Sequence, residues 1–199
     1  MFKYLRLSIT DRCNFRCIYC MPEEGICKQP HSEILRFEEI LPIVEAAVAT
    51  GVEQVRITGG EPLVRRGVVD FVKQLSEIAG LKDLCLTTNG ANLAEFALPL
   101  KKAGLVRVNV SLDSLNPKTF REITRTGDLN RVLDGVYAAI TAELMPVKIN
   151  VVIIPGINDL EINDFARFAR DNPVEVRFIE KMPFAEASVD DEFVSEEQV

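Results

Sequence analysis

Three cysteines, Cys13, Cys17 and Cys20, lie within eight residues with the spacing C-x₃-C-x₂-C. Three thiolates from one short loop can bind three irons of a cubic [4Fe–4S] cluster, which normally takes four protein ligands. The fourth iron then keeps an open position, which a reactive metal centre needs in order to bind a substrate. A zinc knuckle is the alternative, but zinc usually takes four ligands, and neither Cys27 nor His31 has a standard spacing from the three cysteines. The spacing therefore favours an open iron–sulfur site.

A second motif, Gly59-Gly60-Glu61-Pro62, directly follows the expected strand Gln54–Thr58. Paired glycines allow close backbone approach and positive φ, and the proline stiffens the exit of the turn. The carboxylate of Glu61 can accept a hydrogen bond from an amine. By itself the motif could be a plain strand-to-helix turn. However, it comes one strand after the cysteine loop, and we expect both at the carboxyl end of a sheet, where ligands of such folds bind.

Short strand patterns alternate with helical patterns along the chain, which predicts βαβ units and a parallel sheet with helices outside. The expected strands are Tyr4–Thr10, Gln54–Thr58, Leu84–Thr88, Val106–Ser111, Val147–Ile153 and Val174–Ile179. The expected helices are Phe37–Thr50, Val68–Ala79, Leu93–Ala103, Pro117–Thr124, Arg131–Ala142 and Leu160–Arg170. Asn116 before Pro117 has the pattern of a helix start, and Asn158 with Glu161 resembles a capping box.

Each expected strand has one apolar and one polar face, although strands of a parallel sheet are usually apolar on both. The polar faces carry Arg6, Arg56, Thr87, Arg107, Asn109, Ser111, Lys148, Asn150, Glu175 and Arg177. A closed eight-stranded barrel is filled with branched apolar side chains. Six strands with a polar lumen predict instead a partial (β/α)₆ barrel, an α/β fold, around a polar ligand.

The cations of this polar face indicate the charge of the ligand. Burying Arg6, Arg56, Lys148 and Arg177 without partners would be prohibitive, and Glu175 can pair with only one of them. An anionic ligand would resolve the imbalance, and phosphate is the natural candidate. The alternative is that individual charges lie at strand ends and reach solvent.

The composition excludes several classes of protein. The 199 residues carry a net charge of −7, of which residues 183–199 contribute −6, so the remainder is nearly neutral and offers no general basic face for nucleic acid. No apolar run approaches a membrane span, and we see no secretion signal. Three of the five cysteines in one loop argue for a reducing cytoplasm and a metal rather than disulfides. We expect one domain at residues 1–182 and an acidic tail at 183–199.

Together these motifs resemble the radical S-adenosylmethionine (radical SAM) superfamily. The cysteine loop is similar to its cluster site, and Gly59-Gly60-Glu61-Pro62 to its methionine-amine site. From about Tyr4 to Met182 the chain closely resembles the GTP 3′,8-cyclase family of molybdenum cofactor biosynthesis. The matching segments are Leu5–Gly25, Arg56–Leu63, Leu86–Gly90, Val108–Asp113 and Arg177–Glu180.

The resemblance implies a partial TIM-like barrel of the radical SAM type with a [4Fe–4S] cluster and S-adenosylmethionine. In that family S-adenosylmethionine binds the open iron through its amino and carboxylate groups and is cleaved to a 5′-deoxyadenosyl radical. The radical takes a hydrogen atom from C3′ of GTP, and C3′ then attacks C8 to give (8S)-3′,8-cyclo-7,8-dihydroguanosine 5′-triphosphate. The resemblance also implies an electron donor of the flavodoxin or ferredoxin type, and it leaves a homodimer open.

Roles can be carried over by motif position. The cluster ligands would be Cys13, Cys17 and Cys20. S-adenosylmethionine would contact Tyr19, Gly59, Gly60, Glu61, Ser111 and Met182. GTP would be held by Arg6, Arg56, Thr87 and Lys148, with Arg177 also facing the site; the four cations Arg6, Arg56, Lys148 and Arg177 are the expected catalytic residues.

The chain departs from the family in its length. Family members carry a second three-cysteine cluster in a further C-terminal part, whereas here only Cys27 and Cys85 remain, which we interpret as structural or incidental. Ser195-Glu196-Glu197-Gln198 resembles a helix start. We therefore expect a fragment rather than a shortened relative, able to bind one cluster and S-adenosylmethionine but not to complete the cyclisation efficiently. A radical SAM enzyme with another substrate and a non-catalytic iron–sulfur or other metal-binding protein are the alternatives.

Overall fold

A single sheet of six parallel strands organises the computed structural model, which describes residues 2–181. Met182 and the expected acidic tail lie outside the described residues. The strands are β1 (Tyr4–Ser8), β2 (Gln54–Thr58), β3 (Asp83–Thr88), β4 (Arg107–Ser111), β5 (Val147–Ile153) and β6 (Val174–Glu180). They pair in the order β1-β2-β3-β4-β5-β6, so each strand lies beside its neighbour in sequence. This arrangement confirms the α/β partial barrel.

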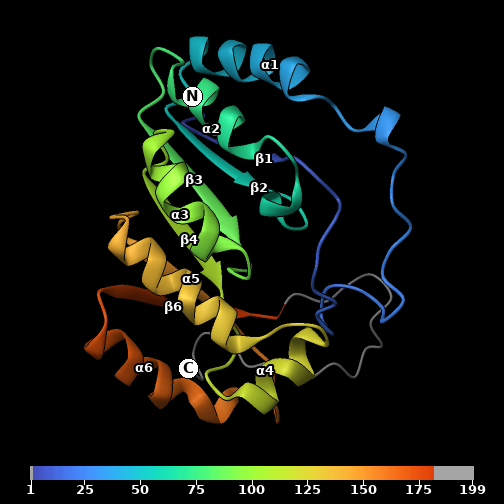
Figure 1. Cartoon of the computed structure of the whole chain (residues 1–199), viewed down its shortest axis with the longest axis vertical. Coiled ribbons are helices and arrows are strands. Elements are labelled where there is room, and N and C mark those ends of the chain that lie inside the picture. Colours follow the sequence, from blue (N-terminus) through green and yellow to red (C-terminus); the bar gives the residue numbers. More distant parts are fainter. Residues whose placement is uncertain (1, 182–199) are drawn as a thin grey trace.

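The described residues form six helices, most of which cover the outer side of the curving sheet (Figure 1). They are α1 (Phe37–Ala49), α2 (Val68–Ser76), α3 (Leu93–Lys102), α4 (Pro117–Thr124), α5 (Leu129–Thr141) and α6 (Ile162–Asp171). Three short 3₁₀ turns, at His31–Glu33, Pro62–Val64 and Asp159–Glu161, lie in the connections. No helix among the described residues has the length and apolar character needed to cross a membrane.

The two helix starts expected from the sequence have different outcomes. The side chain of Asn116 accepts hydrogen bonds from the backbone N–H groups of Lys118 and Thr119, so it caps α4 as predicted. The prediction of a capping box at Asn158 is wrong. The Asn158 side chain is buried and bonds to the backbone of residues 113, 152 and 154, because its amide crosslinks the ends of β4 and β5 instead of starting α6.

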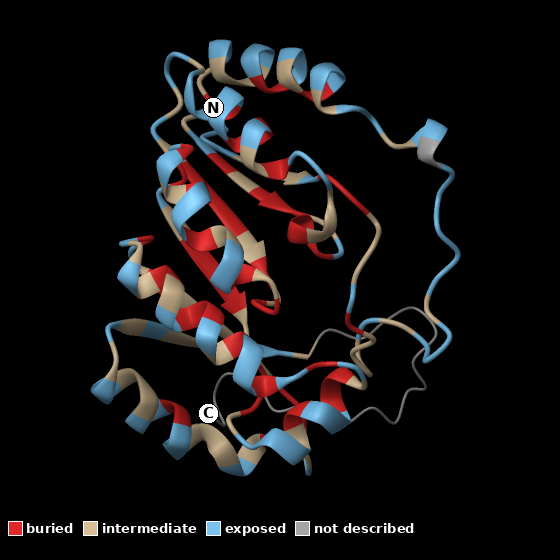
Figure 2. Cartoon of the chain, in the orientation of Figure 1, coloured by how far each residue is buried: buried red, intermediate tan, exposed pale blue. Residues whose placement is uncertain are grey.

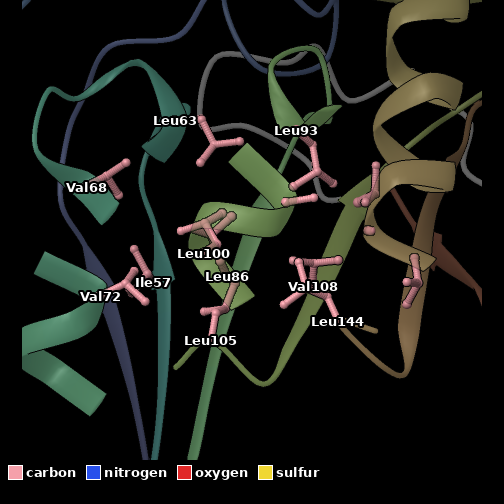
Figure 3. Close-up of a cluster of buried hydrophobic side chains, with 14 of the residues drawn as sticks. Ile57, Leu63, Val68, Val72, Leu86, Leu93, Leu100, Leu105, Val108 and Leu144 are labelled. Atoms are coloured by element: carbon pink, nitrogen blue, oxygen red, sulfur yellow. The ribbon is translucent and has the colours of Figure 1, made fainter. Parts of the chain in front are cut away.

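The period of two in the strands separates the core from the lumen. On β2 to β5 the apolar residues facing the helices, such as Ile57, Leu86 and Val108, are fully buried (Figures 2 and 3). They pack with Leu100 of α3 and other helix residues into one continuous core. Burial of these apolar side chains removes them from water and stabilises the sheet. The opposite face is thereby left to the polar residues, all directed into the curve of the sheet.

Candidate active site

The loop between β1 and α1 carries the three cysteines, and all three are free thiols. Cys17 begins a tight turn, since its carbonyl accepts hydrogen bonds from the backbone N–H groups of Cys20 at 2.9 Å and Met21 at 3.2 Å. Cys13 and Cys17 are half-buried, whereas Cys20 is exposed. This leaves one side of the cysteine loop open to a ligand.

The three thiols share an environment that disfavours thiolates when no metal is bound. Burial, Asp113 and the other two thiols raise the pKa of Cys17, and burial, Asp113 and Cys13 raise the pKa of Cys20 to about 11. Burial also raises the pKa of Cys13, although hydrogen bonds from the Phe15 N–H and the Asn89 amide to its sulfur oppose this. Metal binding must therefore displace the thiol protons.

The three thiols lie near one another, since Cys13 and Cys20 both help to raise the pKa of Cys17. Within residues 2–181, no three Cys, His, Asp or Glu side chains are placed to hold a single metal ion. Three free thiols on one loop are nevertheless the donors that an iron–sulfur cluster takes from a protein.

The Gly59-Gly60 pair, directly after β2, allows the segment that follows β1 to cross close over it. The N–H of Gly60 donates to the carbonyl of Thr10 at 2.7 Å, and the N–H of Glu61 donates to that of Arg12 at 2.8 Å. A Cβ on Gly60 would lie 2.4 Å from the Arg12 oxygen, and one on Gly59 would lie 2.5 Å from the Thr10 oxygen. Only glycine tolerates this approach, which ties the glycine motif to the cysteine loop.

Glu61 is buried and makes a crosslink between β2 and β3. One carboxylate oxygen accepts hydrogen bonds from the Leu63 N–H at 3.0 Å and the Thr88 hydroxyl at 2.8 Å, and the other from the Asn89 N–H at 2.6 Å. Burial raises the pKa of Glu61, while these donors act against the rise. The Asn89 amide in turn donates to Asn14 at 2.8 Å, inside the cysteine loop. One series of hydrogen bonds, through Glu61 and Asn89, thus joins the ends of β2 and β3 to the cysteine loop.

Asp113, just beyond β4, holds the cysteine loop from the other side. Its buried carboxylate accepts hydrogen bonds from the Tyr19 hydroxyl at 2.7 Å and from the Val152 N–H at 2.8 Å. Burial raises the pKa of Asp113 to about 6, although both hydrogen bonds oppose this. Because Tyr19 lies between Cys17 and Cys20, this carboxylate determines where that part of the loop stands.

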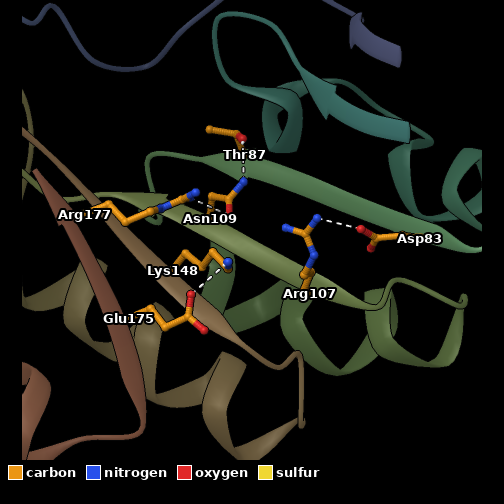
Figure 4. A network of polar contacts seen from close by, with 7 residues as sticks. All are labelled: Asp83, Thr87, Arg107, Asn109, Lys148, Glu175 and Arg177. Atoms are coloured by element: carbon orange, nitrogen blue, oxygen red, sulfur yellow. Dashed lines mark hydrogen bonds and ion pairs between the residues drawn. The ribbon is translucent and has the colours of Figure 1, made fainter. Parts of the chain in front are cut away.

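The lumen of the sheet contains three separate groups of polar side chains, and the members of each group are joined by hydrogen bonds or an ion pair (Figure 4). Lys148 pairs with Glu175 at 2.8 Å, and Arg107 pairs with Asp83 at 2.6 Å. Arg177 donates to the Asn109 amide oxygen at 3.1 Å, and the Asn109 amide donates to the Thr87 hydroxyl at 3.3 Å.

Two lumen arginines lack an acidic partner in the described chain. No carboxylate lies within ion-pair distance of Arg56 or Arg177 there, and the buried Nε atom of each has no hydrogen-bond acceptor. Burial and the cations Arg56 and Arg107 lower the pKa of Arg177, and Glu175 acts against this, so these charges influence one another across the lumen. The amide oxygen of Asn150 is likewise buried without a donor. This part of the lumen therefore carries more positive than negative charge.

The structure brings most of the expected site residues to the lumen or to its upper rim. Thr87, Ser111, Lys148 and Arg177 are half-buried on the polar face, and Gly60 is exposed at the rim. Arg6 differs, because it lies on the edge strand β1 and is exposed, so its charge reaches solvent and needs no ligand to compensate it. Met182 lies outside the described residues, so its expected contact stays a prediction.

Sequence reasoning assigned no role to Asn89, Asp113 or the Arg107–Asp83 pair. Asn89 and Asp113 each follow a strand end directly or by one residue, and that position was a usable signal because the carboxyl ends of parallel strands meet at one edge. Asp83 carried no such signal, since it begins a strand and its pairing with β4 depends on the sheet register.

Comparison with known proteins gives the class first. A model of the radical SAM superfamily matches residues 7–169, and the chain belongs to this superfamily. The particular relatives are more specific. The chain is 57% identical over 198 residues to the GTP 3′,8-cyclase of Alkaliphilus oremlandii, which covers 98% of this chain and 62% of that protein. It is also 57% identical over 180 residues to the GTP 3′,8-cyclase of Geobacter sulfurreducens, with 90% and 55% covered. The chain therefore spans less than two thirds of the length of these relatives.

Solved structures share the fold. A radical SAM methyltransferase from Sphaerobacter thermophilus superposes with a TM-score of 0.75 at 18% identity, covering 98% of this chain and 60% of that one. The [FeFe]-hydrogenase maturase HydG superposes with a TM-score of 0.74 at 17% identity, covering 98% and 47%. Radical SAM enzymes use a [4Fe–4S] cluster and S-adenosylmethionine, and these are the cofactors of this chain. The three free thiols and the open rim beside them fit this pair.

Replacing Gly60 with alanine should disturb the cysteine loop through steric overlap. The added methyl group meets the Arg12 backbone, so we expect Gly60→Ala to lower the free energy of unfolding by about 1–3 kcal/mol and to reduce iron uptake. Urea unfolding of the apo chain and iron analysis after anaerobic reconstitution measure the two effects. Gly156→Ala is the control, because Gly156 has φ +70° but no atom within 4 Å of its added Cβ. Equal iron loss in both variants would contradict the steric explanation.

The buried Asp113 carboxylate should make the apo chain less stable as pH rises. Its raised pKa means that the folded state keeps the Asp113 proton between pH 4 and about 6 while the unfolded state releases it. The free energy of unfolding of Asp113→Asn minus that of the wild type should therefore increase by about 2 kcal/mol from pH 4 to pH 7. Urea titrations at each pH measure it, with Asp134→Asn, exposed on α5, as the control. A difference that is independent of pH would refute the prediction.

Proposed function

We propose that this chain is the radical SAM core of a GTP 3′,8-cyclase and that its lumen binds GTP. The observation that carries the proposal is the convergence of Arg56, Arg107 and Arg177 with too few acidic partners. Buried donors without acceptors are rare in proteins, so a ligand is the expected partner. A triphosphate supplies several oxygen acceptors and the negative charge that this group of cations lacks. The names of the relatives described above agree with this substrate.

Arg56, Lys148 and Arg177 would hold the phosphates and ribose of GTP, with Thr87 as a hydroxyl partner. Arg56 and Arg177 can each offer a guanidinium fork, which suits phosphate oxygens. Lys148 is already paired with Glu175, but Glu175 is half-exposed and leaves the ammonium group able to bind a second anion. Arg6, at the exposed edge of the lumen, would contact the solvent-facing part of the ligand.

The rim residues would bind the cofactors. Cys13, Cys17 and Cys20 would ligate the cluster, while Tyr19, Gly59, Gly60, Glu61 and Ser111, together with Met182, would position S-adenosylmethionine. When bound, the two cofactors supply the radical that removes a hydrogen atom from the substrate. Because the β1 exit covers Gly59 and Gly60, their remaining backbone groups and the exposed side of Gly60 are the surfaces left for a ligand. Glu61 would act mainly by fixing this turn, since three protein donors already occupy its carboxylate.

The proposal extends to the surroundings of the enzyme. Reduced thiols in one loop suit a cytoplasmic protein, and an iron–sulfur enzyme needs an electron donor, for which we propose the flavodoxin or ferredoxin type. We propose that residues 1–182 form the catalytic core and that 183–199 is an acidic tail, with a homodimer as an open part of the proposal.

The charge of the lumen can be tested by ligand binding. Arg56→Ala and Arg177→Ala should each weaken binding of GTP to the cluster-loaded chain about tenfold to a hundredfold, because each removes a charged hydrogen-bond donor. Binding of guanosine, which lacks phosphate, should change little. Arg167→Ala is the matched control, since Arg167 is exposed on α6 and pairs with Asp164. Equilibrium dialysis measures the affinities of the wild type and the three variants for GTP and for guanosine. Unchanged GTP binding in both lumen variants would contradict the proposed site.

The position of hydrogen removal tests the reaction itself. When the cluster-loaded chain is reduced in the presence of S-adenosylmethionine and GTP deuterated at C3′, deuterium should appear in 5′-deoxyadenosine. Mass spectrometry of that product detects the transfer, and GTP deuterated only at C8 is the control, which should transfer none. Unlabelled 5′-deoxyadenosine from the C3′-deuterated nucleotide would contradict GTP 3′,8-cyclase chemistry.

A further inference from the structure

The end of α4 lies directly against the cysteine loop, although more than a hundred residues separate them in the sequence. The N–H of Arg16 donates to the carbonyl of Thr124 at 3.1 Å, and the N–H of Ile18 donates to that of Ile123 at 2.9 Å. The Thr126 hydroxyl donates to the carbonyl of Asn14 at 3.0 Å. The loop has no helix or strand of its own between β1 and the 3₁₀ turn at His31–Glu33, so its shape depends on such contacts.

Arg125 makes the contact that spans the loop. One nitrogen of its guanidinium group, Nη1, donates to the carbonyls of Arg16 and Met21, each at 2.9 Å. These two carbonyls stand immediately before Cys17 and immediately after Cys20. The arginine therefore joins the two ends of the segment that carries two of the three cluster ligands.

The backbone of Arg125 has an unfavourable conformation for a residue with a side chain. The residue ends α4 with φ of 59°, a conformation that costs a non-glycine residue free energy. Its ψ of −38° also lies outside the left-handed helical region, in which many helices end with glycine. The two hydrogen bonds from the Arg125 side chain to the cysteine loop offset the free energy cost of this backbone conformation.

We infer that Arg125 is a positioning residue of the iron–sulfur cluster, which holds the Cys17–Cys20 segment at the separation that the cluster requires. Two tertiary hydrogen bonds to one rigid donor preorganise ligands that would otherwise lie on an irregular loop. The role is additional to the cysteine ligands, and it depends on the cluster site alone, not on GTP as the substrate.

Cluster retention tests this inference in the full chain reconstituted anaerobically. Arg125→Ala should lose its cluster about tenfold faster than the wild type in the presence of an iron chelator, followed by the decay of the visible absorbance. Arg125→Lys, which keeps the charge but has no planar guanidinium group, should restore part of the retention. The electron paramagnetic resonance spectrum of the reduced cluster should broaden in Arg125→Ala, because the cysteine positions become heterogeneous.

Arg121→Ala is the matched control, since Arg121 is on the same helix and donates to the carbonyl of Gly127, outside the cysteine loop. It should keep its cluster as the wild type does, while the two alanine variants should show similar apo unfolding midpoints. The inference is overturned if Arg125→Ala retains its cluster normally, or if cluster loss in both variants follows apo stability. A wild-type chain that takes up no iron would overturn it together with the cofactor assignment. If the variants retain their clusters as expected here but the wild-type chain does not bind GTP, only the proposed function is overturned.

Discussion

The close crossing of two backbones at the sheet's upper rim is the constraint on which this site depends. The N–H groups of Gly60 and Glu61 donate hydrogen bonds to the chain leaving β1 at 2.7 and 2.8 Å, and a Cβ on Gly59 or Gly60 would overlap that chain. This crossing brings the cysteine loop over β2, where Asn89 reaches it from β3 and Asp113 from β4. An irregular loop thereby acquires the rigidity of the three strands beneath it.

Charge is distributed unevenly between the rim and the lumen. The rim holds the three thiols with Glu61 and Asp113, and burial and their mutual proximity raise the pKa values of these groups. The lumen below holds guanidinium groups that outnumber their acidic partners. A substrate with a charged phosphate end and an uncharged sugar would be oriented by this difference, with its phosphates toward the guanidinium groups of the lumen. The charge distribution therefore supports the proposed function independently of the relatives.

The strands, their order and their polar face were predictable because each depends on a local pattern. An alternation of two, as in Val55-Arg56-Ile57-Thr58, is visible in any single strand, and short helical connections leave a parallel neighbour order as the natural outcome. The Asn116 cap also depends on adjacent residues and was predicted correctly. Asn158 was assigned wrongly because its partners, on β4 and β5, are distant in sequence.

By itself, the sequence determined the chemistry that is available: three thiols at cluster spacing, a glycine pair after a strand, and cations on a polar strand face. Only the tertiary structure decided how these groups are held and which charges are compensated. Glu175 forms an ion pair with Lys148, and Asp83 forms one with Arg107. Arg125, at the end of α4, donates hydrogen bonds to the cysteine loop, which is more than a hundred residues away in the sequence. Spacing along a chain specifies what one loop can ligate, whereas pairing between strands and helices depends on sheet register and curvature, which no local pattern encodes.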